Sequence, residues 1–393
     1  MKCEWTTKKI SEIANFSTGK LNSNAAVDNG KYPFFTCAPE PLKIDTYNFD
    51  EKAIILAGNN AEGNFHISFY EGKFNAYQRT YIITSKRENV VDTKYLYYAL
   101  KLCLAEFKVI SQGTTTKFLT ARILSNFEII LPAIYIQNKI AAILSALDEK
   151  IATNRAINEN LEEQAQALFK KLFVDNPDAI SWKKGNFSNL IEKTISGDWG
   201  KDSPSGNNTE MVYCIRGADI PEVRAGNKGK MPTRYILPKN YAAKQLVDGD
   251  IVVEISGGSP TQSTGRAAAV SDALLARYDK GMVCTNFCKA LKPRAGYSMY
   301  VYYYWQYLYD RNIFFSYENG TTGIKNLDIN GFIETEPITI APEDLVEKFD
   351  AVCQTVFSKI YANGMENEQL ALVRDTLLPK LMSGEIDVSA VQL

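Results

Sequence analysis

The fold is decided by the stretch IAAILSALDEKIATNRAINENLEEQAQALFKKL, residues 140–172. Its counterpart FDAVCQTVFSKIYANGMENEQLALVRDTLLPKL, residues 349–381, follows about 209 positions later. In both stretches, residues at alternating gaps of four and three form one heptad stripe: Ile140, Leu144, Leu147, Ile151, Asn154, Asn158, Leu161, Ala165, Leu168 and Leu172, then Phe349, Cys353, Val356, Ile360, Asn363, Asn367, Leu370, Arg374, Leu377 and Leu381. Each stripe predicts a long helix, and two such helices can bury their apolar faces against each other.

Each stripe carries a pair of asparagines near its middle, Asn154 with Asn158 and Asn363 with Asn367. Polar residues in an apolar seam cost stability but can fix the register of the two helices. If the helices pair antiparallel, the four asparagines meet near the centre. The alternative is a solvent-exposed kink at Gly364.

The remaining sequence is mixed, which predicts an α+β fold with a pseudo-twofold internal repeat. Short strand-like runs such as 53–56, 81–84, 250–255 and 338–340 lie between Gly, Asn and Asp turns. We expect four segments: a mixed domain at 1–131, a central helix at 132–179, a second mixed domain at 180–340, and a C-terminal helix at 341–388. Helices of about 40 residues would span about 60 Å and hold one mixed domain at each end.

The two mixed domains share landmarks in the same order. Trp5 corresponds to Trp182, and Gly113-Thr114-Thr115, followed by Lys117, corresponds to Gly320-Thr321-Thr322, followed by Lys325. The residues between these landmarks differ. The scaffold is therefore repeated while its loops are not, and loops on a rigid scaffold usually carry specificity.

Composition favours an ordinary globular protein without a membrane span. Of 393 residues, 45% are hydrophobic and 23% charged, with a net charge of −1. The start of the chain lacks an apolar signal segment, so export is not expected, and seven cysteines without tight spacing suit a reducing cytoplasm. A near-neutral chain can still bind nucleic acid through a local basic face.

Catalytic and metal-binding patterns are missing, which favours a binding protein. The only histidine, His66, is expected at a structural strand position, and Cys284 with Cys288 lacks the partners of a zinc site. No phosphate loop or nucleophile elbow is present. Glu254 follows an apolar run but lacks the lysine of a nuclease motif. We expect no catalytic residue, metal or cofactor in this chain.

The helices resemble those of the specificity subunits of Type I restriction–modification enzymes. The segment LPAIYIQNKI, residues 131–140, is similar to that family's "LPPLxxQxxI" helix start, and ILSALD, residues 143–148, to its "ILSxLD" continuation. Segments 165–170, 173–175 and 377–386 resemble the rest of its conserved helical regions. The likeness covers the whole chain in layout but is specific only at the helices, and the second helix start, Glu343-Asp344-Leu345, lacks the glutamine.

This resemblance implies a DNA-binding, non-catalytic subunit. Each mixed domain would read one half of a split, asymmetric site in double-stranded DNA, and the helices would set the gap. Two modification subunits would dock around the helices and bring S-adenosylmethionine. Restriction subunits would bring ATP- and Mg-dependent cleavage.

The candidate DNA contacts fall into two classes. Lysines and an arginine in Gly/Ser/Thr-rich loops are phosphate candidates, together with the two Gly-Thr-Thr turns: Lys20, Lys117, Lys201, Arg266 and Lys325. Long or amide side chains near those loops are base-reading candidates: Asn59, Asn60, Gln78, Arg79, Arg216, Gln262 and Asn286. Each lysine can equally be a solvated surface charge, and each Gly-Thr-Thr a plain turn.

Two other functions are compatible with the residues alone. One is a two-headed scaffold that binds proteins or glycans, and the other is a self-contained nuclease or methyltransferase.

Overall fold

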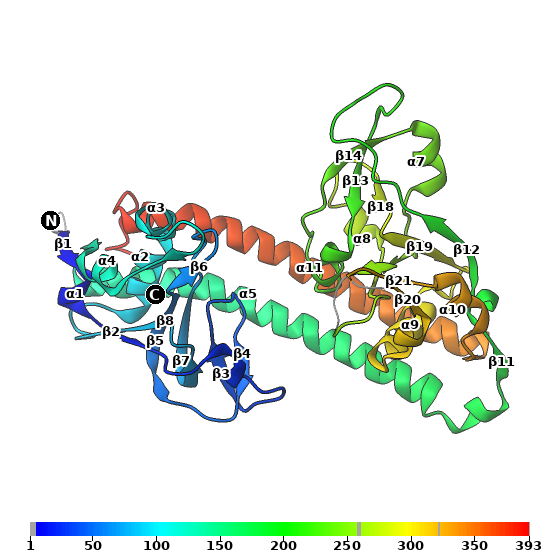
Figure 1. Ribbon diagram of the computed structural model, residues 1–393, viewed down its shortest axis with the longest axis horizontal. Helices are drawn as coiled ribbons and strands as arrows, with labels where there is room; N and C mark the ends of the chain where they lie inside the picture. Colours follow the sequence, from blue (N-terminus) through cyan, green and yellow to red (C-terminus); the bar gives the residue numbers. More distant parts are fainter. Residues whose placement is uncertain (1–4, 258–260, 321–322, 393) are drawn as a thin grey trace. The chain divides into compact units, whose positions relative to one another are not determined.

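The computed structural model describes residues 5–257, 261–320 and 323–392 (Figure 1). The chain divides into two compact units. Unit 1 contains Met1–Lys150 with Leu370–Leu393, and unit 2 contains Ile151–Gln369. Each unit holds one mixed α+β domain and a part of both long helices, so each is described by itself.

Unit 1 is built on a six-stranded sheet in the order β2-β8-β5-β7-β3-β4. Its strands are β2 (Ala14–Thr18), β3 (Tyr32–Phe35), β4 (Leu42–Ile44), β5 (Phe49–Ala57), β7 (Ile67–Ala76) and β8 (Thr80–Ser85). The expected strands 53–56 and 81–84 lie within β5 and β8. His66 lies directly before β7 rather than inside it, although its carbonyl still accepts a hydrogen bond from the backbone N–H of Ala57 at 2.8 Å.

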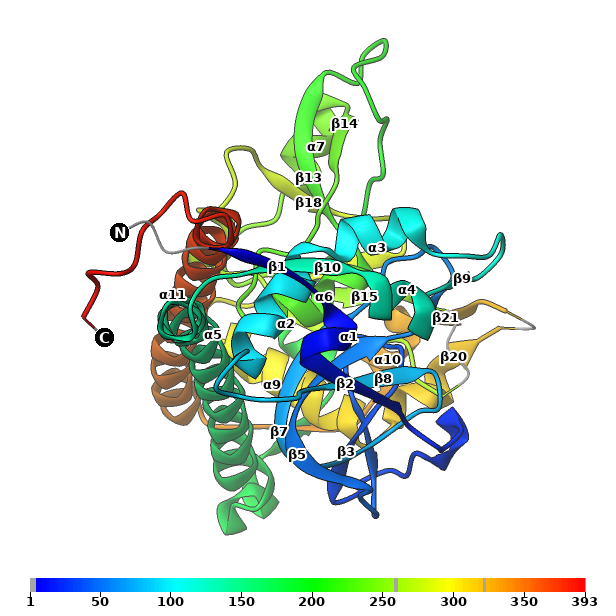
Figure 2. The same ribbon diagram turned by 90° about the vertical axis from the view of Figure 1, so that its left-hand side faces the viewer.

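Helices and short strands close unit 1 around this sheet: β1 (Thr6–Lys9), α1 (Ile10–Ile13), β6 (Asn59–Asn60), α2 (Thr93–Leu102), α3 (Leu104–Ile110), β9 (Lys117–Phe118), α4 (Ala121–Asn126) and β10 (Glu128–Leu131). Helix α2 lies between the sheet and the long helices (Figure 2). Its apolar side joins the core, where Tyr95 and Leu96 are fully buried. The Tyr98 hydroxyl donates to Asp148 of the first long helix at 2.7 Å.

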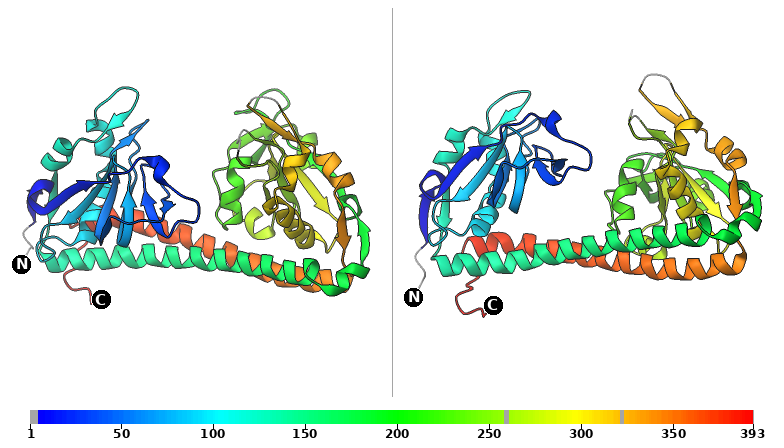
Figure 3. Two further views of the ribbon diagram at one scale, coloured as in Figure 1. Left: turned by 60° about the horizontal axis from the view of Figure 1, so that its bottom comes forward. Right: turned by 90° about the horizontal axis from the view of Figure 1, so that it is seen from below.

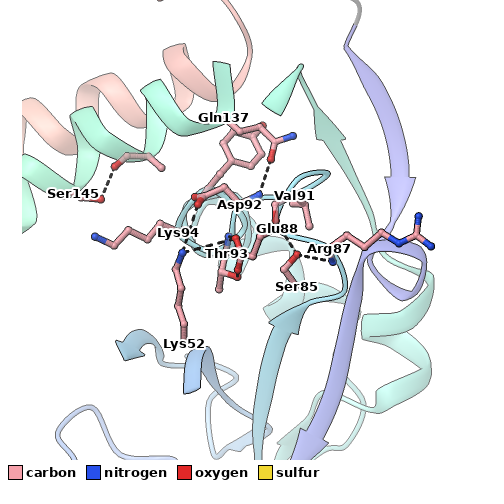
Figure 4. Close-up of polar contacts among 12 residues, drawn as sticks. Lys52, Ser85, Arg87, Glu88, Val91, Asp92, Thr93, Lys94, Gln137 and Ser145 are labelled. Atoms are coloured by element: carbon pink, nitrogen blue, oxygen red, sulfur yellow. Dashed lines mark hydrogen bonds and ion pairs between the residues drawn. The ribbon is translucent and has the colours of Figure 1, made fainter. Parts of the chain in front are cut away.

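A buried glutamine connects the first long helix to α2 (Figure 4). The Gln137 side chain accepts a hydrogen bond from the backbone N–H of Asp92 and donates to the carbonyls of Val90 and Pro132. Asp92 in turn caps α2 by accepting from the N–H of Tyr95. Because Gln137 is 1% exposed, these three bonds satisfy an otherwise costly buried amide. They fix the angle at which the helix leaves the domain.

Unit 2 repeats the strand order of unit 1 with one strand broken. Its sheets are β12-β19-β15-β17 and β14-β13-β18. The strands are β12 (Ile191–Ser196), β13 (Glu210–Ile215), β14 (Thr233–Ile236), β15 (Ile251–Glu254), β17 (Ala267–Ala269), β18 (Met282–Cys284) and β19 (Cys288–Pro293). Strands β17 and β18 replace the continuous β7, and α8 (Asp272–Leu275) stands between them.

The remaining elements of unit 2 are β11 (Lys183–Gly185), α6 (Ile220–Arg224), α7 (Pro238–Lys244), β16 (Ser256–Gly257), α9 (Ser298–Asp310), β20 (Glu318–Asn319), β21 (Lys325–Leu327), α10 (Ile329–Thr335) and β22 (Ile338–Ile340). The expected strands at 250–255 and 338–340 correspond to β15 and β22. Helix α9 matches α2, because the Tyr300 hydroxyl donates to the carbonyl of Thr339 as that of Tyr95 does to Ile130.

The strand registers give the correspondence between the units residue by residue. Ala57 pairs with Thr80 across β5 and β8, and Glu254 pairs with Cys288 across β15 and β19. Phe35 pairs with Ala76, and Ile215 pairs with Cys284, in the two parallel ladders. Positions 57 and 254, and positions 35 and 215, are therefore equivalent.

The long helices are α5 (Ile134–Phe169), extended by a π-helical turn at Lys170–Val174, and α11 (Glu343–Met382). They run antiparallel, as predicted. In unit 2 the Phe169 ring lies 5.9 Å from Phe349. In unit 1 the Arg374 guanidinium donates to Asp148 at 2.6 Å. The α+β fold with paired antiparallel helices is thus confirmed.

The four asparagines form a buried ladder within unit 2. Asn154 donates to Asn367 at 3.0 Å, and Asn363 donates to Asn158 at 2.8 Å. Asn158 also donates to the carbonyls of Ile360 and Ala225. These bonds satisfy buried amide groups in the observed alignment of the two helices. That the asparagines fix the register stays a prediction.

Gly364 does not form an exposed kink. It is buried inside the continuous helix α11, and a Cβ atom at this position would lie 1.9 Å from the carbonyl oxygen of Gly226, in the turn after α6. Arg277 donates to the same carbonyl and to Glu368, and the backbone N–H of Lys228 also bonds Glu368. The glycine therefore lets the long loop between β13 and β14 dock on α11.

No helix among the described residues is long and apolar enough to cross a bilayer.

The docking contact predicts that Gly364→Ala lowers the free energy of unfolding. Helix propensity alone would make this change stabilising by about 1 kcal/mol. The backbone clash should outweigh it and cost about 1–3 kcal/mol. Urea unfolding measures the difference. Met365→Ala, at the exposed neighbouring position, is the control and should change stability by less than about 0.5 kcal/mol. A stabilised Gly364→Ala protein would contradict the contact.

Candidate nucleic-acid interface

Several of the candidate DNA contacts of each unit lie at one corner of its sheet. In unit 1 this corner comprises the end of β5, strand β6, the turn 77–79 and the hairpin that ends in β9. The backbone N–H of Gly58 bonds the carbonyl of Arg79, and Asn59 and Asn60 pair with Phe118 and Lys117. The hairpin stands away from the parts of α5 and α11 that belong to the unit (Figure 3). It can therefore meet a ligand without displacing the helices.

The base-reading candidates of unit 1 are brought together there. Arg79 is exposed, and its guanidinium lies 5.5 Å from the centre of the Phe118 ring. Gln78 donates to Asn22, and Asn59 accepts from the Cys37 thiol. The side-chain amide oxygen of Asn60 accepts from two backbone N–H groups, those of Glu62 and Asn64. The side-chain oxygen of Asn60 is therefore occupied by hydrogen bonds within a local turn, while Gln78 and Arg79 are exposed to solvent.

The phosphate candidates of unit 1 surround the same corner. Gly113, Thr114 and Thr115 form the exposed tip of the hairpin, and Gly113 has a φ of 106°, which favours glycine. Lys117 begins the returning strand β9. Lys20 is exposed just after β2, next to Leu21, which bridges to Tyr77.

Unit 2 forms the same corner with different side chains. The backbone N–H of Ile255 bonds the carbonyl of Phe287, and that of Leu327 bonds the carbonyl of Ile255. These two bonds repeat the Gly58–Arg79 and Leu119–Gly58 bonds of unit 1. Phe287 therefore occupies the position of Arg79, and Asn286 that of Gln78. Gly257 pairs with Lys325 as Asn60 does with Lys117.

A cavity of about 500 Å³ opens at the corner of unit 2. Its walls mix aromatic, amide and charged side chains with backbone: Trp199, Arg216, Gly217, Ala218, Glu254, Ser256, Thr285, Asn286 and Phe287. Phe287 is 62% exposed, and Trp199 is held from one side by Arg234, whose guanidinium lies 4.1 Å from the ring centre. Rigid exposed aromatic groups beside hydrogen-bonding groups suit a flat, polar-edged ligand such as a nucleobase.

Two arginines at this corner are held by buried carboxylates. Arg266 donates to both oxygens of Glu254 at 2.7 Å, and Arg216 donates to both oxygens of Asp219 at 2.9 and 3.1 Å. In each pair the carboxylate hydrogen bonds raise the pKa of the guanidinium. The Arg266 charge is neutralised inside the protein, which makes it a structural residue more than a phosphate contact.

The other candidates of unit 2 are more scattered. Lys325 pairs with Glu318 at 3.1 Å and lies over the Phe315 ring. Lys201 is exposed on the outer side of β14, where its backbone bridges to Tyr235. Gln262 interacts with Tyr309. Gly320 directly follows β20, whereas Thr321 and Thr322 lie outside the described residues.

Trp199 and Phe287 were not identified as candidates from the sequence. Phe287 had a detectable signal, because a large apolar residue in the short turn between two apolar strands is unusual. Trp199 had none, since its position beside Arg216 depends on how β12 and β13 pack.

The cysteines of unit 2 are buried thiols. Burial raises the pKa of Cys288 and of Cys214 to about 12, which keeps both protonated at neutral pH. No group of three or more metal-ligating side chains occurs in the described parts of the chain.

The first part of the chain is similar to a family of DNA specificity domains. The Type I restriction modification DNA specificity domain matches residues 2–163. Over 160 residues the chain is 36% identical to the EcoDI specificity subunit of Escherichia coli, which covers 41% of this chain and 35% of that subunit. The match thus spans about a third of that relative.

Two further relatives extend over nearly the whole chain. The MjaIX specificity subunit of Methanocaldococcus jannaschii is 27% identical over 429 residues, covering 98% of this chain and 94% of that one. The crystal structure of a Type I restriction–modification S subunit from M. genitalium superposes with a TM-score of 0.60 at 18% identity, covering 97% and 96% of the two chains. The last likeness concerns the fold alone.

Proposed function

Because residues 2–163 match a Type I restriction modification DNA specificity domain and specificity subunits are similar to the chain over most of its length, we propose that it belongs to this family and selects the DNA sequence on which such an enzyme acts. Each unit reads one half of a bipartite, asymmetric site in double-stranded DNA. The observation that carries this proposal is the recurrence of one corner in both units, on matching hydrogen bonds, with different side chains.

The side-chain differences account for an asymmetric site. Unit 1 presents Gln78 and Arg79 where unit 2 presents Asn286 and Phe287. An amide and a guanidinium read hydrogen-bonding base edges, whereas a phenyl ring packs against the thymine methyl group. Two corners of such different chemistry select different half-sites.

The chain itself acts without catalysis in this proposal. Two modification subunits supply S-adenosylmethionine and dock around the paired helices, and restriction subunits supply ATP- and Mg-dependent cleavage. The helices α5 and α11 set the gap between the half-sites, since the asparagine ladder holds them in one register.

Selection from random-sequence DNA tests the function. The chain, assembled with its modification subunits, should enrich two short constant blocks separated by a gap of fixed length. Exchanging residues 183–340 for the equivalent domain of a relative should change one block only. Enrichment of no motif, or a change in both blocks, would overturn the proposal.

Phosphate binding by Lys117 predicts a specific salt response. No ion-pair partner of Lys117 occurs among the described residues, whereas Lys325 is already neutralised by Glu318. Lys117→Ala should weaken binding to all sequences alike and reduce the slope of log K against log salt by about 1. Lys325→Ala should reduce it by less. The slope is measured by titration at several salt concentrations, and an unchanged slope for Lys117→Ala would exclude that contact.

The helix pair predicts a way to lengthen the gap. One heptad inserted after Lys150 and another after Leu370 lie opposite each other, because Asp148 meets Arg374 and Asn154 meets Asn367. The contacts within each unit are kept. Helices α5 and α11 each become about 10 Å longer, which corresponds to about three base pairs along DNA. Selection should recover the same two blocks with a longer gap. A heptad in α5 alone is the control and should impair assembly.

A further inference from the structure

Arg216 combines three properties: it lines the cavity, it is held rigidly, and it keeps an unused donor group. Its Nε and Nη2 atoms donate to Asp219, and Nη2 also donates to the carbonyl of Lys230 at 2.9 Å. No hydrogen-bond partner of Nη1 occurs among the described residues. The planar guanidinium thus leaves two N–H groups of Nη1 free on the edge away from Asp219.

The carboxylate that holds Arg216 is itself fixed. Asp219 is 2% exposed and accepts additional bonds from the backbone N–H groups of Arg216 and Lys230. A ligand therefore meets a donor that has already lost its rotamer freedom, which reduces the entropy cost of binding.

The charge of this pair favours a neutral acceptor over a phosphate. Asp219 offsets the charge of Arg216, so the pair attracts a distant phosphate only weakly. Because Nε and Nη2 are already used, the Nη1 amine alone approaches the O6 and N7 acceptors on the major-groove edge of guanine, as a lysine amine does. Adenine offers a donor where guanine has O6, so it cannot satisfy both.

The cavity adds further contacts beside this donor. Arg216 lines it together with Trp199 and Phe287, so a base that enters the cavity meets two aromatic side chains as well as the guanidinium.

Unit 1 has no counterpart of this group. The paired positions Phe35–Ala76 and Ile215–Cys284 place Thr36 where unit 2 has Arg216. The contact is therefore a property of one half-site.

We propose that Arg216, held by Asp219, is a specificity-determining residue that reads a guanine from the major groove in the half-site bound by unit 2. This inference rests on the proposed DNA-reading function and adds the identity of one base.

Modified DNA tests the inference on the unaltered protein, assembled with its modification subunits. In the block that changes when residues 183–340 are exchanged, one guanine should be replaceable by inosine, which keeps O6 and N7, with less than about twofold loss of affinity. Replacing the same guanine by 7-deazaguanine, which lacks the N7 acceptor, should weaken binding about fivefold or more. If no guanine in that block responds in this way, the inference is wrong.

Variants of the protein give an independent test. Arg216→Gln alone would leave the buried Asp219 carboxylate without its cationic partner, so the double variant Arg216→Gln with Asp219→Asn is also made. Both should lose the preference for that guanine by about tenfold while keeping the other block and the salt slope. Arg311→Ala, an exposed arginine outside the corner, should keep the preference.

The outcomes separate the two proposals. A bipartite motif whose guanine preference survives in the double variant would overturn the role of Arg216 and leave the proposed function standing. A uniform loss of affinity with a flatter salt dependence would assign Arg216 to a phosphate instead. Absence of any motif with the unaltered protein would remove both.

Discussion

Burial of two apolar helix faces on each other is the constraint on which the structure depends. Neither α5 nor α11 could stay helical over its length without a partner for its stripe, since helical stability in proteins comes mainly from packing. Apolar packing alone tolerates sliding by a heptad, whereas sliding would break the Asn154–Asn367 and Asn158–Asn363 bonds. The contact between the helices thus combines non-directional apolar burial with four buried amides whose bonds depend on the alignment.

Sequence periodicity was sufficient to predict the long helices and the internal repeat. It was not sufficient to predict which side chains are available at the corner of each sheet. The heptad stripe predicts α5 and α11 to within a few residues, because helix period and apolar burial follow from the local sequence. The Gly-Thr-Thr landmarks likewise locate the hairpin in unit 1. The local sequence does not show which cationic side chains already have an ion-pair partner. The pairing of Arg266 with Glu254 and of Lys325 with Glu318 depends on strand register and on the path of the loops.

Gly364 is a second case in which a contact between distant segments could not be predicted from the local sequence. A glycine in a helix of otherwise good helix formers suggests a kink, because the sequence shows its low propensity but not its neighbours. The structure gives it a steric purpose, the close approach of the Gly226 carbonyl. Unit 2 carries a long loop with α6 between β13 and β14, whereas unit 1 connects β3 to β4 with a short turn. The sheets of the two units have the same strand order. They differ because a long loop of unit 2 packs against α11.

This bracing restricts how such chains can exchange parts. A foreign domain grafted between β11 and β22 inherits α11 as its neighbour, and therefore meets the buried face of Gly364 whatever DNA it reads. In a domain whose β13–β14 loop follows the same path, any residue other than glycine at position 226 would place a Cβ atom 2.5 Å from the carbonyl oxygen of Ile360. The fit of a grafted domain to α11 therefore depends on this loop as well as on the corner of its sheet.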